Sequence, residues 1–389
     1  MLAVREFRVP SVILTGSGAS QQVGEQCSKR GLQKGLIVTD ETIRSSGIVP
    51  QIEQALSQSG IAYSIYDGVA TEPVIEFVEA GLEMYREEGC DFVLAVGGGS
   101  PIDTAKAIAV MTTNEGSISD YKGIGKIAEK GAPLVAVPTT AGTGSEATVY
   151  TIITDAATDV KMLIGSPFVM PDMAIVDPLL TVSSPPGVTA ATGIDALVHA
   201  IEAYVSVKAQ PMSDIFALSA IELISGNLRQ AWANGEDLDA REKTMLGALQ
   251  AGIAFSNSSV ALVHGMSRPI GAYFHLAHGV SNAVLLVVVM EFSLTGNARR
   301  YADIAQALGE NTDGLTDIQA AELAVQAVRR LVSDVSIPPL HELIQDEEEF
   351  YRLAPQMAED AIDSGSPANN PRQATKEEII ELYRLAYSG

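Results

Sequence analysis

Short apolar runs alternate with amphipathic stretches along the first half of the chain. Four short runs of strand-forming residues lie at 35–40, 62–67, 91–100 and 132–140, and they end in Asp, Thr or a glycine–serine turn. Stretches with helical spacing, such as 50–58 and 74–88, separate the first three runs. Strand, helix and strand in this rhythm predict a mainly parallel sheet covered by helices. Further short runs at 150–155, 160–165 and 174–177 predict a hairpin and a closing strand.

The pattern changes after the segment SSPPG at 183–187. Ala- and Leu-rich amphipathic stretches follow to the end of the sequence without a convincing strand. In the last of them, Thr375 and Glu378 have the spacing of a capping box. The chain has 389 residues, which exceeds the length at which a single hydrophobic core usually stops growing. We therefore predict an α/β domain over residues 1–186 and an all-helical domain over residues 187–389.

Composition and charge exclude several classes of protein. Apolar residues make up 47% and charged residues 19% of the chain, which is typical of an ordered globular protein. The net charge of −23, without a basic stripe, repels nucleic acid and anionic membranes. The two cysteines follow no disulfide framework, the N-terminus lacks a signal-peptide pattern, and the longest apolar run is too short to span a bilayer. We therefore expect a soluble, cytoplasmic protein with no nucleic-acid or membrane partner.

A glycine-rich turn follows the buried run at 91–96. Its glycines allow the backbone to approach a ligand closely, and the helix after it offers free N–H groups and a positive dipole end. We expect Ser100 to be the N-cap of that helix, Pro101 its first residue and Asp103 the reciprocal capping residue. The turn favours a pyrophosphate site, although an ordinary strand–helix turn fits it equally well when it is taken alone. The predicted phosphate-binding glycines are Gly97, Gly98 and Gly99.

Two other loops favour a dinucleotide ligand. The loop after the run at 132–138 carries several hydroxyls at the carboxyl end of a predicted parallel strand, where open α/β sheets bind ligands. Asp40 ends its own strand, where it can accept a hydrogen bond from a ribose diol and repel a 2′-phosphate; a turn-starting aspartate is the alternative. Asp40 precedes the glycines, whereas the usual fingerprint has its acid about 20 residues after them. We therefore expect a nucleotide-binding sheet of non-standard order that prefers NAD(H) over NADP(H). The hydroxyl-bearing candidates are Thr139, Thr140, Thr143 and Ser145.

The apolar segment TGIDALVHAIEAY at 192–204 carries three polar groups on one helical face. Asp195 and His199 are four residues apart, and Glu202 follows three residues later. Charged groups directed into a core are costly unless they are paired or bound to a metal. An ordinary ion pair on a partly wet helix face is the alternative for any such pair taken alone.

A second apolar segment, ALVHGMSRPIGAYFHLAHGVSN, contains three of the five histidines of the chain, His264, His275 and His278. Neutral imidazoles combined with one carboxylate form a site suited to zinc or iron(II). Such sites usually take their ligands from facing helices, which agrees with the helical second half. We therefore predict a metal site in which Asp195 and His199 are two ligands from one helix.

Four segments in order resemble the signatures of the iron-containing (group III) alcohol dehydrogenases. They are GGGSPIDTAKAIA, PTTAGTGSEAT, TGIDALVHAIEAY and HGMSRPIGAYFHLAHGVSNAVLL. The resemblance runs from Phe7 to the segment NNPRQATKEEI. It implies a dinucleotide-binding N-terminal domain, an all-helical C-terminal domain, and a cleft between them for NAD(P) and a divalent metal. Iron(II) is the first expectation for the metal and zinc the alternative, and a homodimer or higher homo-oligomer is the expected assembly.

The resemblance also implies roles for individual residues. Carried over by position, the metal ligands are Asp195, His199, His264 and His278, which leaves Glu202 and His275 as neighbours of the ligands at most. Lys161 joins the candidate cofactor contacts.

This chain departs from the family pattern at two positions. Many members have a histidine four residues after the first ligand of the HGM segment, where this chain has Arg268, and often Asn or Asp where it has His275. A proton relay through that extra histidine therefore does not carry over. We single out Arg268 as a candidate contact for an anionic group of the substrate, and pairing with a carboxylate is its alternative. His275 is a candidate proton shuttle, with a structural role as the alternative.

Together these features predict hydride transfer between NAD(H) and a small alcohol or aldehyde, which the metal assists as a Lewis acid. Zinc-dependent glycerol dehydrogenases and dehydroquinate synthases have related folds, but Pro101 after the glycine–serine turn follows the alcohol-dehydrogenase pattern. A metallohydrolase would have no use for Asp40 or the glycine turn. A non-catalytic nucleotide sensor would have no use for four metal ligands.

Overall fold

The computed structural model describes residues 4–158 and 160–389, which form two compact units. One unit comprises Arg8–Ser183, and the other comprises Ser184–Gly389 together with the N-terminal segment that ends at Phe7. Phe7 stacks on Phe216, with ring centroids 5.7 Å apart, and the Arg5 guanidinium donates to backbone carbonyls at 208 and 209. The chain passes from the first unit to the second between Ser183 and Ser184, just before the predicted boundary at Pro186, and residues 4–7 pack with the helical unit.

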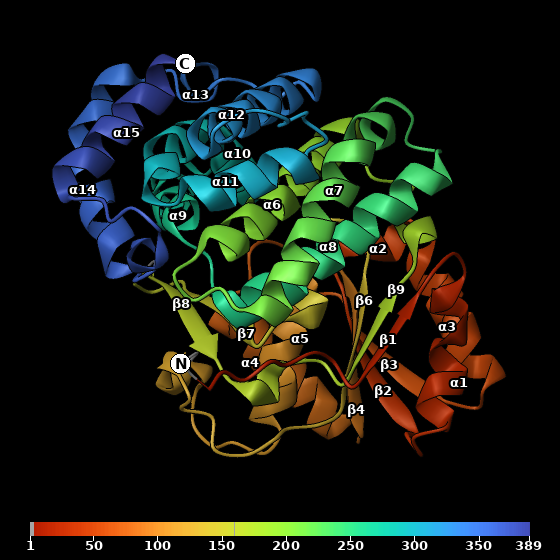
Figure 1. Cartoon of the computed structure of the whole chain (residues 1–389). Coiled ribbons are helices and arrows are strands. Elements are labelled where there is room, and N and C mark those ends of the chain that lie inside the picture. The colour runs from red at the N-terminus through yellow and green to blue at the C-terminus, as the bar shows by residue number, and fades with distance from the viewer. Residues whose placement is uncertain (1–3, 159) are drawn as a thin grey trace. The chain divides into compact units, whose positions relative to one another are not determined.

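The α/β unit is built on a six-stranded sheet in the order β1-β9-β6-β4-β2-β3, in which every pair of neighbours is parallel (Figure 1). Both central strands, β4 and β6, are buried along their whole length, which explains their continuous apolar runs. The predicted parallel sheet is confirmed. Its strands are β1 (Val12–Thr15), β2 (Lys34–Val38), β3 (Ala62–Tyr66), β4 (Phe92–Gly97), β6 (Leu134–Pro138) and β9 (Met173–Val176).

Helices cover both faces of this sheet. Along β2, Leu36 and Val38 belong to a core cluster shared with α4 and α5, whereas Ile37 belongs to a cluster shared with α1 and α3. This alternation follows from the period of two in a strand, which sends successive side chains to opposite faces. The helices are α1 (Val23–Ser28), α2 (Glu41–Ser45), α3 (Ile48–Gln58), α4 (Ile75–Glu87) and α5 (Gly99–Met111).

A second, three-stranded sheet is formed by β5 (Gly123–Ile124), β7 (Tyr150–Asp155) and β8 (Val160–Gly165). Strands β7 and β8 are antiparallel, with Ile153 opposite Met162. The predicted hairpin and the closing strand β9 are therefore confirmed.

Helices make up the second unit, and no residue from 187 to 389, all of which are described, lies in a strand. Helix α6 lies among α7, α8 and α10 and is buried over most of its length, as its apolar sequence predicts. The predicted capping box of the last helix is confirmed, because Thr375 Oγ1 accepts from Glu378 N–H at 3.2 Å and Glu378 Oε2 accepts from Thr375 N–H at 2.9 Å. The helices are α6 (Pro186–Val205), α7 (Pro211–Ala233), α8 (Leu238–Ser258), α9 (Leu262–Phe274), α10 (His278–Ser293), α11 (Ala298–Ala307), α12 (Asp317–Asp334), α13 (Leu340–Leu343), α14 (Glu347–Asp363) and α15 (Lys376–Ser388).

By length and composition alone, one helical stretch of the described chain, His278–Gly296, is apolar enough to cross a membrane, and α8 with α9 passes the same test as a bent pair. Core helices of soluble proteins pass this test too, and 50% of the stretch is buried inside the structure.

Candidate metal centre and cofactor site

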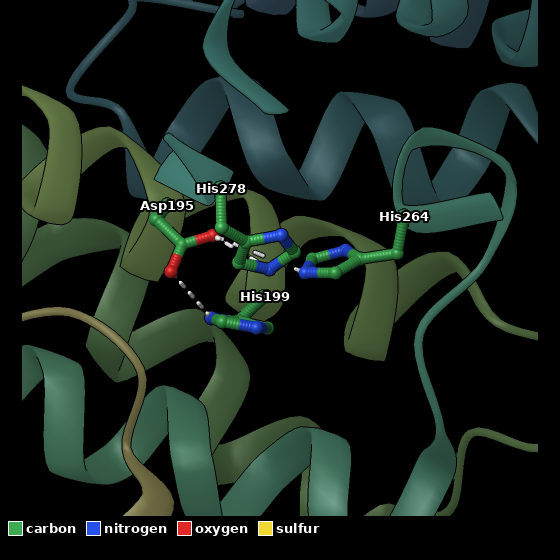
Figure 2. Close-up of side chains that lie close together, drawn as sticks. All are labelled: Asp195, His199, His264 and His278. Atoms are coloured by element: carbon green, nitrogen blue, oxygen red, sulfur yellow. Dashed lines mark ion pairs between the residues drawn. The ribbon is translucent and has the colours of Figure 1, made fainter. Parts of the chain in front are cut away.

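Four side chains from three helices converge inside the helical unit. Asp195 and His199 stand one turn apart on α6, His264 lies in the first turn of α9, and His278 is the first residue of α10 (Figure 2). Asp195 carboxylate oxygens lie 3.8 Å from His199 Nδ1, 3.9 Å from His264 Nε2 and 3.7 Å from His278 Nε2. One potential ligand atom from each residue lies within 4.8 Å of the others. The structure thus brings together the four predicted ligands, and they form a cluster without Glu202 or His275.

Burial holds two imidazoles of this cluster, those of His264 and His278, in their neutral form. Burial lowers the pKa of His264 well below the usual histidine value, and the positive forms of His199 and Arg268 lower it further against the opposing charge of Asp195. Burial also lowers the pKa of His278, again against Asp195, with His264 and His199 adding to the effect. A neutral imidazole keeps a lone pair that a metal can accept, so the cluster offers three nitrogens and a carboxylate to a divalent ion. This donor set fits iron(II) or zinc.

Glu202 orients one ligand without joining the cluster. Its Oε2 lies 2.6 Å from His264 Nδ1, and its Oε1 accepts from the Val263 N–H at 2.6 Å. Burial raises the pKa of Glu202 to about 7. When Nδ1 donates to the carboxylate, the lone pair of the ring lies on Nε2, the nitrogen that faces Asp195.

Asn282 is a member of the site that the sequence analysis missed. It lies fully buried on α10, one turn after His278, and its Nδ2 donates to Asp195 Oδ1 at 2.6 Å. The same nitrogen lies 3.1 Å from His264 Nε2 and 3.2 Å from His278 Nε2, so one amide faces three of the four ligand atoms. Its spacing of four residues from His278, which places both on one helical face, was the available signal in the sequence. An uncharged side chain in an apolar helix does not by itself indicate a metal site.

The candidate cofactor loops lie side by side on the α/β unit. Strand β4 pairs with β2 on one side, with Val38 opposite Ala95, and with β6 on the other, with Gly97 opposite Pro138. Asp40, the glycine turn and the threonine loop therefore follow three neighbouring strands, although they are far apart in sequence. The chain leaves β2 towards the edge strand β3 and returns to β4 on the opposite side, so β2 and β4 flank a topological switch point. Open α/β sheets bind dinucleotides at such a point.

The predicted capping of α5 was wrong. Gly98 is the N-cap and α5 begins at Gly99, so Ser100 and Pro101 lie inside the first turn. Asp103 does not cap the helix, because it accepts from Ser145 Oγ at 2.5 Å and from the Ile152 N–H at 2.9 Å. Gly98, which has an extended backbone, precedes the helix and supplies no side-chain cap. The first N–H groups of the helix are thereby left available to a ligand.

Close packing explains the glycine at position 99 of this turn. A Cβ on Gly99 would lie 2.9 Å from Thr143 Cγ2, whereas one on Gly98 would lie 3.5 Å from Thr140 Oγ1. A side chain at Gly99 would therefore displace the threonine loop. The backbone of the turn and the loop fit together closely at the edge where a pyrophosphate would lie, which suits a dinucleotide.

Two other cofactor candidates, Asp40 and Lys161, already form polar contacts within the α/β unit. Asp40 caps α2, with its Oδ1 accepting from the Ile43 N–H at 2.8 Å, so the turn-starting role is observed. The cap uses one oxygen of the carboxylate, and the second oxygen can still accept from a ribose hydroxyl. The ribose contact therefore stays a prediction. Lys161 on β8 forms an ion pair with Glu72 at 2.6 Å, and its cofactor contact also stays a prediction.

The two candidate substrate residues lie at different places along α9, Arg268 at its middle and His275 at its C-terminal cap. Arg268 stands one turn after His264, and the helix continues through Pro269. Its guanidinium donates to Ser366 Oγ at 3.2 Å, and no carboxylate of the described residues forms an ion pair with it, contrary to the carboxylate-pairing alternative. His275 ends the helix in a left-handed conformation, with φ 54°, and is exposed. Its proton-shuttle role stays a prediction.

Comparison with known proteins identifies the family of this chain. Residues 10–178 match the family described as iron-containing alcohol dehydrogenase, and residues 189–387 match its C-terminal family. The chain belongs to the iron-containing alcohol dehydrogenase family. The 1,3-propanediol dehydrogenase of Citrobacter freundii is 43% identical over 385 residues, which cover 98% of each chain.

Two further relatives cover nearly the whole chain. The NAD-dependent methanol dehydrogenase of Bacillus methanolicus is 39% identical over 380 residues, with 98% of this chain and 99% of the relative covered. The crystal structure of a 1,3-propanediol oxidoreductase superposes with a TM-score of 0.96 at 42% identity, covering 99% of this chain and 100% of the other.

Family membership confirms the predicted reaction class. The chain is an oxidoreductase that interconverts alcohols and aldehydes. The family uses NAD(H) and iron, and the buried Asp and His cluster of this chain fits such a metal. The metallohydrolase and nucleotide-sensor alternatives are therefore set aside.

Proposed function

We propose that this protein is an NAD(H)-preferring, metal-dependent reductase of small aldehydes, which also oxidises the corresponding alcohols. The observation that supports this proposal is a cluster of four side chains around one point in the helical unit, those of Asp195, His199, His264 and His278. In this proposal the four residues hold one divalent ion, with iron(II) as the first choice and zinc as the alternative. The bound ion would act as a Lewis acid towards the substrate oxygen.

The residues around the proposed ligands would hold the ligand side chains in fixed orientations. Glu202 fixes the ring of His264 through Nδ1, and Asn282 fixes the carboxylate of Asp195 through a 2.6 Å hydrogen bond. Phe255 of α8 stacks on the ring of His199, with centroids 4.3 Å apart. These contacts restrict the rotation of three ligands, so the site needs little rearrangement when it binds a metal.

The carboxyl edge of the parallel sheet is the proposed NAD(H) site. The start of α5 would bind the pyrophosphate through backbone N–H groups, and Asp40 would accept from the ribose diol. The NAD-dependent relative from Bacillus methanolicus supports this choice of nucleotide. A 2′-phosphate beside the Asp40 carboxylate would meet like-charge repulsion, which disfavours NADP(H).

The first test combines metal content with turnover. Protein reconstituted separately with Fe²⁺, Zn²⁺ and Mn²⁺ is assayed on a panel of aldehydes with NADH and NADPH. His264→Ala and His278→Ala should each lose most of the bound metal and nearly all turnover, while circular dichroism shows the helical unit still folded. Full metal content and normal activity in both variants would refute the metal site.

We also propose a cytoplasmic homodimer. Both cysteines are buried and free, which suits a reducing compartment. Met212 and Ile215 lie on one face of α7 with 50% and 64% of their surface exposed, and exposed apolar groups of this kind often mark an interface. Light scattering coupled to gel filtration tests the assembly, and a monomeric mass at micromolar concentration would contradict it.

A further inference from the structure

The guanidinium of Arg268 is partly buried and is the least satisfied arginine side chain among the described residues of the helical unit. It has five N–H donors, and its one hydrogen bond in the described structure goes to the hydroxyl of Ser366. Its Nε is buried without any partner. A buried N–H donor without a partner is costly, so the position calls for an explanation.

Other arginines of the same unit are satisfied in ordinary ways. Arg241, which is more deeply buried than Arg268, donates to the Gly235 carbonyl at 2.9 Å, to Thr189 Oγ1 at 2.8 Å and to the carbonyl at 184 at 3.3 Å. Most of the remaining arginines pair with carboxylates, namely Arg229, Arg299, Arg300, Arg329, Arg330, Arg352, Arg372 and Arg384. In a chain of net charge −23, a carboxylate partner for Arg268 would be easy to provide.

Glu202 is the acidic group whose charge acts on Arg268, but it does not neutralise the guanidinium by contact. One Glu202 oxygen is 2.6 Å from His264 Nδ1 and the other is 2.6 Å from the Val263 nitrogen. Both oxygens are therefore directed at α9 backbone and ring atoms, and no ion pair joins Glu202 to Arg268. A short-range anion partner for Arg268 is missing from the described protein.

Arg268 lies close to the proposed metal ligands. It follows His264 by one helical turn, a rise of ~6 Å along the axis, so both side chains leave the same face of α9. Its charge also contributes to the lowered pKa of both His264 and His278. The guanidinium thus lies within electrostatic range of the point where the substrate oxygen would bind.

We propose that Arg268 binds an oxyanion head group at the far end of a short substrate, so that the enzyme acts on aldehydes bearing a carboxylate, sulfonate or phosphonate. This inference rests on the proposed function, because it places the reacting carbonyl at the Asp195 and His cluster. The planar guanidinium can hold two oxygens of such a head group at once. Because the negative field of the whole protein repels small anions, a local cation of this kind is required to bind one. Ser366 positions the guanidinium through its hydroxyl.

The test compares substrates that differ only in charge. Succinic semialdehyde and its methyl ester are reduced by the metal-loaded enzyme with NADH, in the wild type, in Arg268→Met and in Arg268→Lys. We expect the wild type to prefer the acid, and the ratio of kcat/KM for acid over ester to fall in Arg268→Met on the order of 10–150-fold, the loss of one charge-assisted contact. In Arg268→Lys the ratio should fall less, because lysine keeps the positive charge but lacks the planar guanidinium that donates two hydrogen bonds at once. The corresponding sulfonate and phosphonate aldehydes then show which head group fits best.

Arg241→Met is the matched control, since it also removes an arginine without a carboxylate partner. If that variant does not fold, Arg229→Met at the surface replaces it. Neither control should change the acid-to-ester ratio. A wild type that reduces acid and ester equally well, or a ratio unchanged in Arg268→Met, would overturn the inference and leave the proposed function standing.

A binding measurement separates the two proposals completely. Calorimetry with propionate on the metal-loaded protein should show binding in the wild type, and affinity should fall at least tenfold in Arg268→Met. If no aldehyde is reduced with either nucleotide, the proposed function fails, and propionate binding that depends on Arg268 would still support an anion site. Equal propionate affinity in wild type and variant would refute that site.

Discussion

The Oε2 atom of Glu202 lies 2.6 Å from Nδ1 of His264, and both side chains are buried inside the helical unit. The two residues belong to different helices, α6 and α9, so the contact joins the helix that carries Asp195 and His199 to the one that carries His264. A histidine whose far nitrogen is held in this way presents its other nitrogen in one fixed direction. The pair therefore couples the packing of two helices to the geometry of the metal site.

Glu202→Gln should keep one metal per chain at saturating metal but bind it more weakly. The amide oxygen can still accept from one donor, while the charge that favours Nδ1–H is lost. Groups that orient a ligand typically contribute 10–100-fold to metal affinity, so we expect a loss of about tenfold. Competition with a chelator measures the affinity. A variant that retains no metal at saturation would mean that Glu202 is itself a ligand.

Asn282→Ala should weaken metal binding about 10–100-fold, because Asp195 loses the amide that donates to its Oδ1. Ser281→Ala is the control, since its hydroxyl is equally buried on α10 but donates to the Ala277 carbonyl at 3.2 Å. Chelator competition on both variants gives the comparison. Equal metal affinity in the two variants would show that Asn282 does not position the carboxylate.

The substitution Asn282→Asp should destabilise the metal-free protein and strengthen the stabilising effect of added metal. A second carboxylate beside Asp195 repels it, so the melting temperature of the metal-free protein should fall relative to wild type. Added Zn²⁺ should raise the melting temperature of this variant more than that of wild type, because the ion neutralises both charges. An equal rise in both proteins would contradict the placement of Asn282 at the cluster.

Helical spacing on an apolar face and a concentration of rare histidines predicted a metal site from the sequence. These signals alone did not exclude Glu202 or His275, and the set of four proposed ligands came from the family resemblance. Asn282 has helical spacing from His278 but is neither charged nor a histidine, and its contacts with the cluster follow from the way α10 packs against α6 and α9. The start of α5 was mispredicted because Ser100 is a good N-cap by type, whereas the glycines before it allow the helix to begin earlier. The proximity of Asp40 to the glycine turn depends on the order of the strands, which no local pattern encodes.

Glu146 gives the α/β unit a pH-dependent stability. Burial raises the pKa of its carboxyl from 4.5 to about 7, although its own backbone N–H and Lys106 favour the charged form. In the unfolded chain this group ionises near pH 4.5, so its contribution to stability is full below that pH and is lost as the pH rises to about 7. Glu146→Gln should therefore raise the melting temperature relative to wild type at pH 8 and change it much less at pH 5. An equal change at both pH values would contradict the raised pKa.

Asp40→Gly should narrow or invert the preference for NAD(H) over NADP(H). The substitution removes the carboxylate that would repel a 2′-phosphate and accept from the ribose diol. Glycine is the appropriate replacement because Asp40 also caps α2 through the Ile43 N–H, and glycine at an N-cap costs only a few tenths of a kcal/mol. Asp237→Gly is the control, since Asp237 caps α8 in the helical unit by accepting from the Ala240 N–H at 3.0 Å. The ratio of kcat/KM for NADH over NADPH should fall in Asp40→Gly and stay constant in Asp237→Gly. A wild type that already uses NADPH better than NADH would refute this role of Asp40.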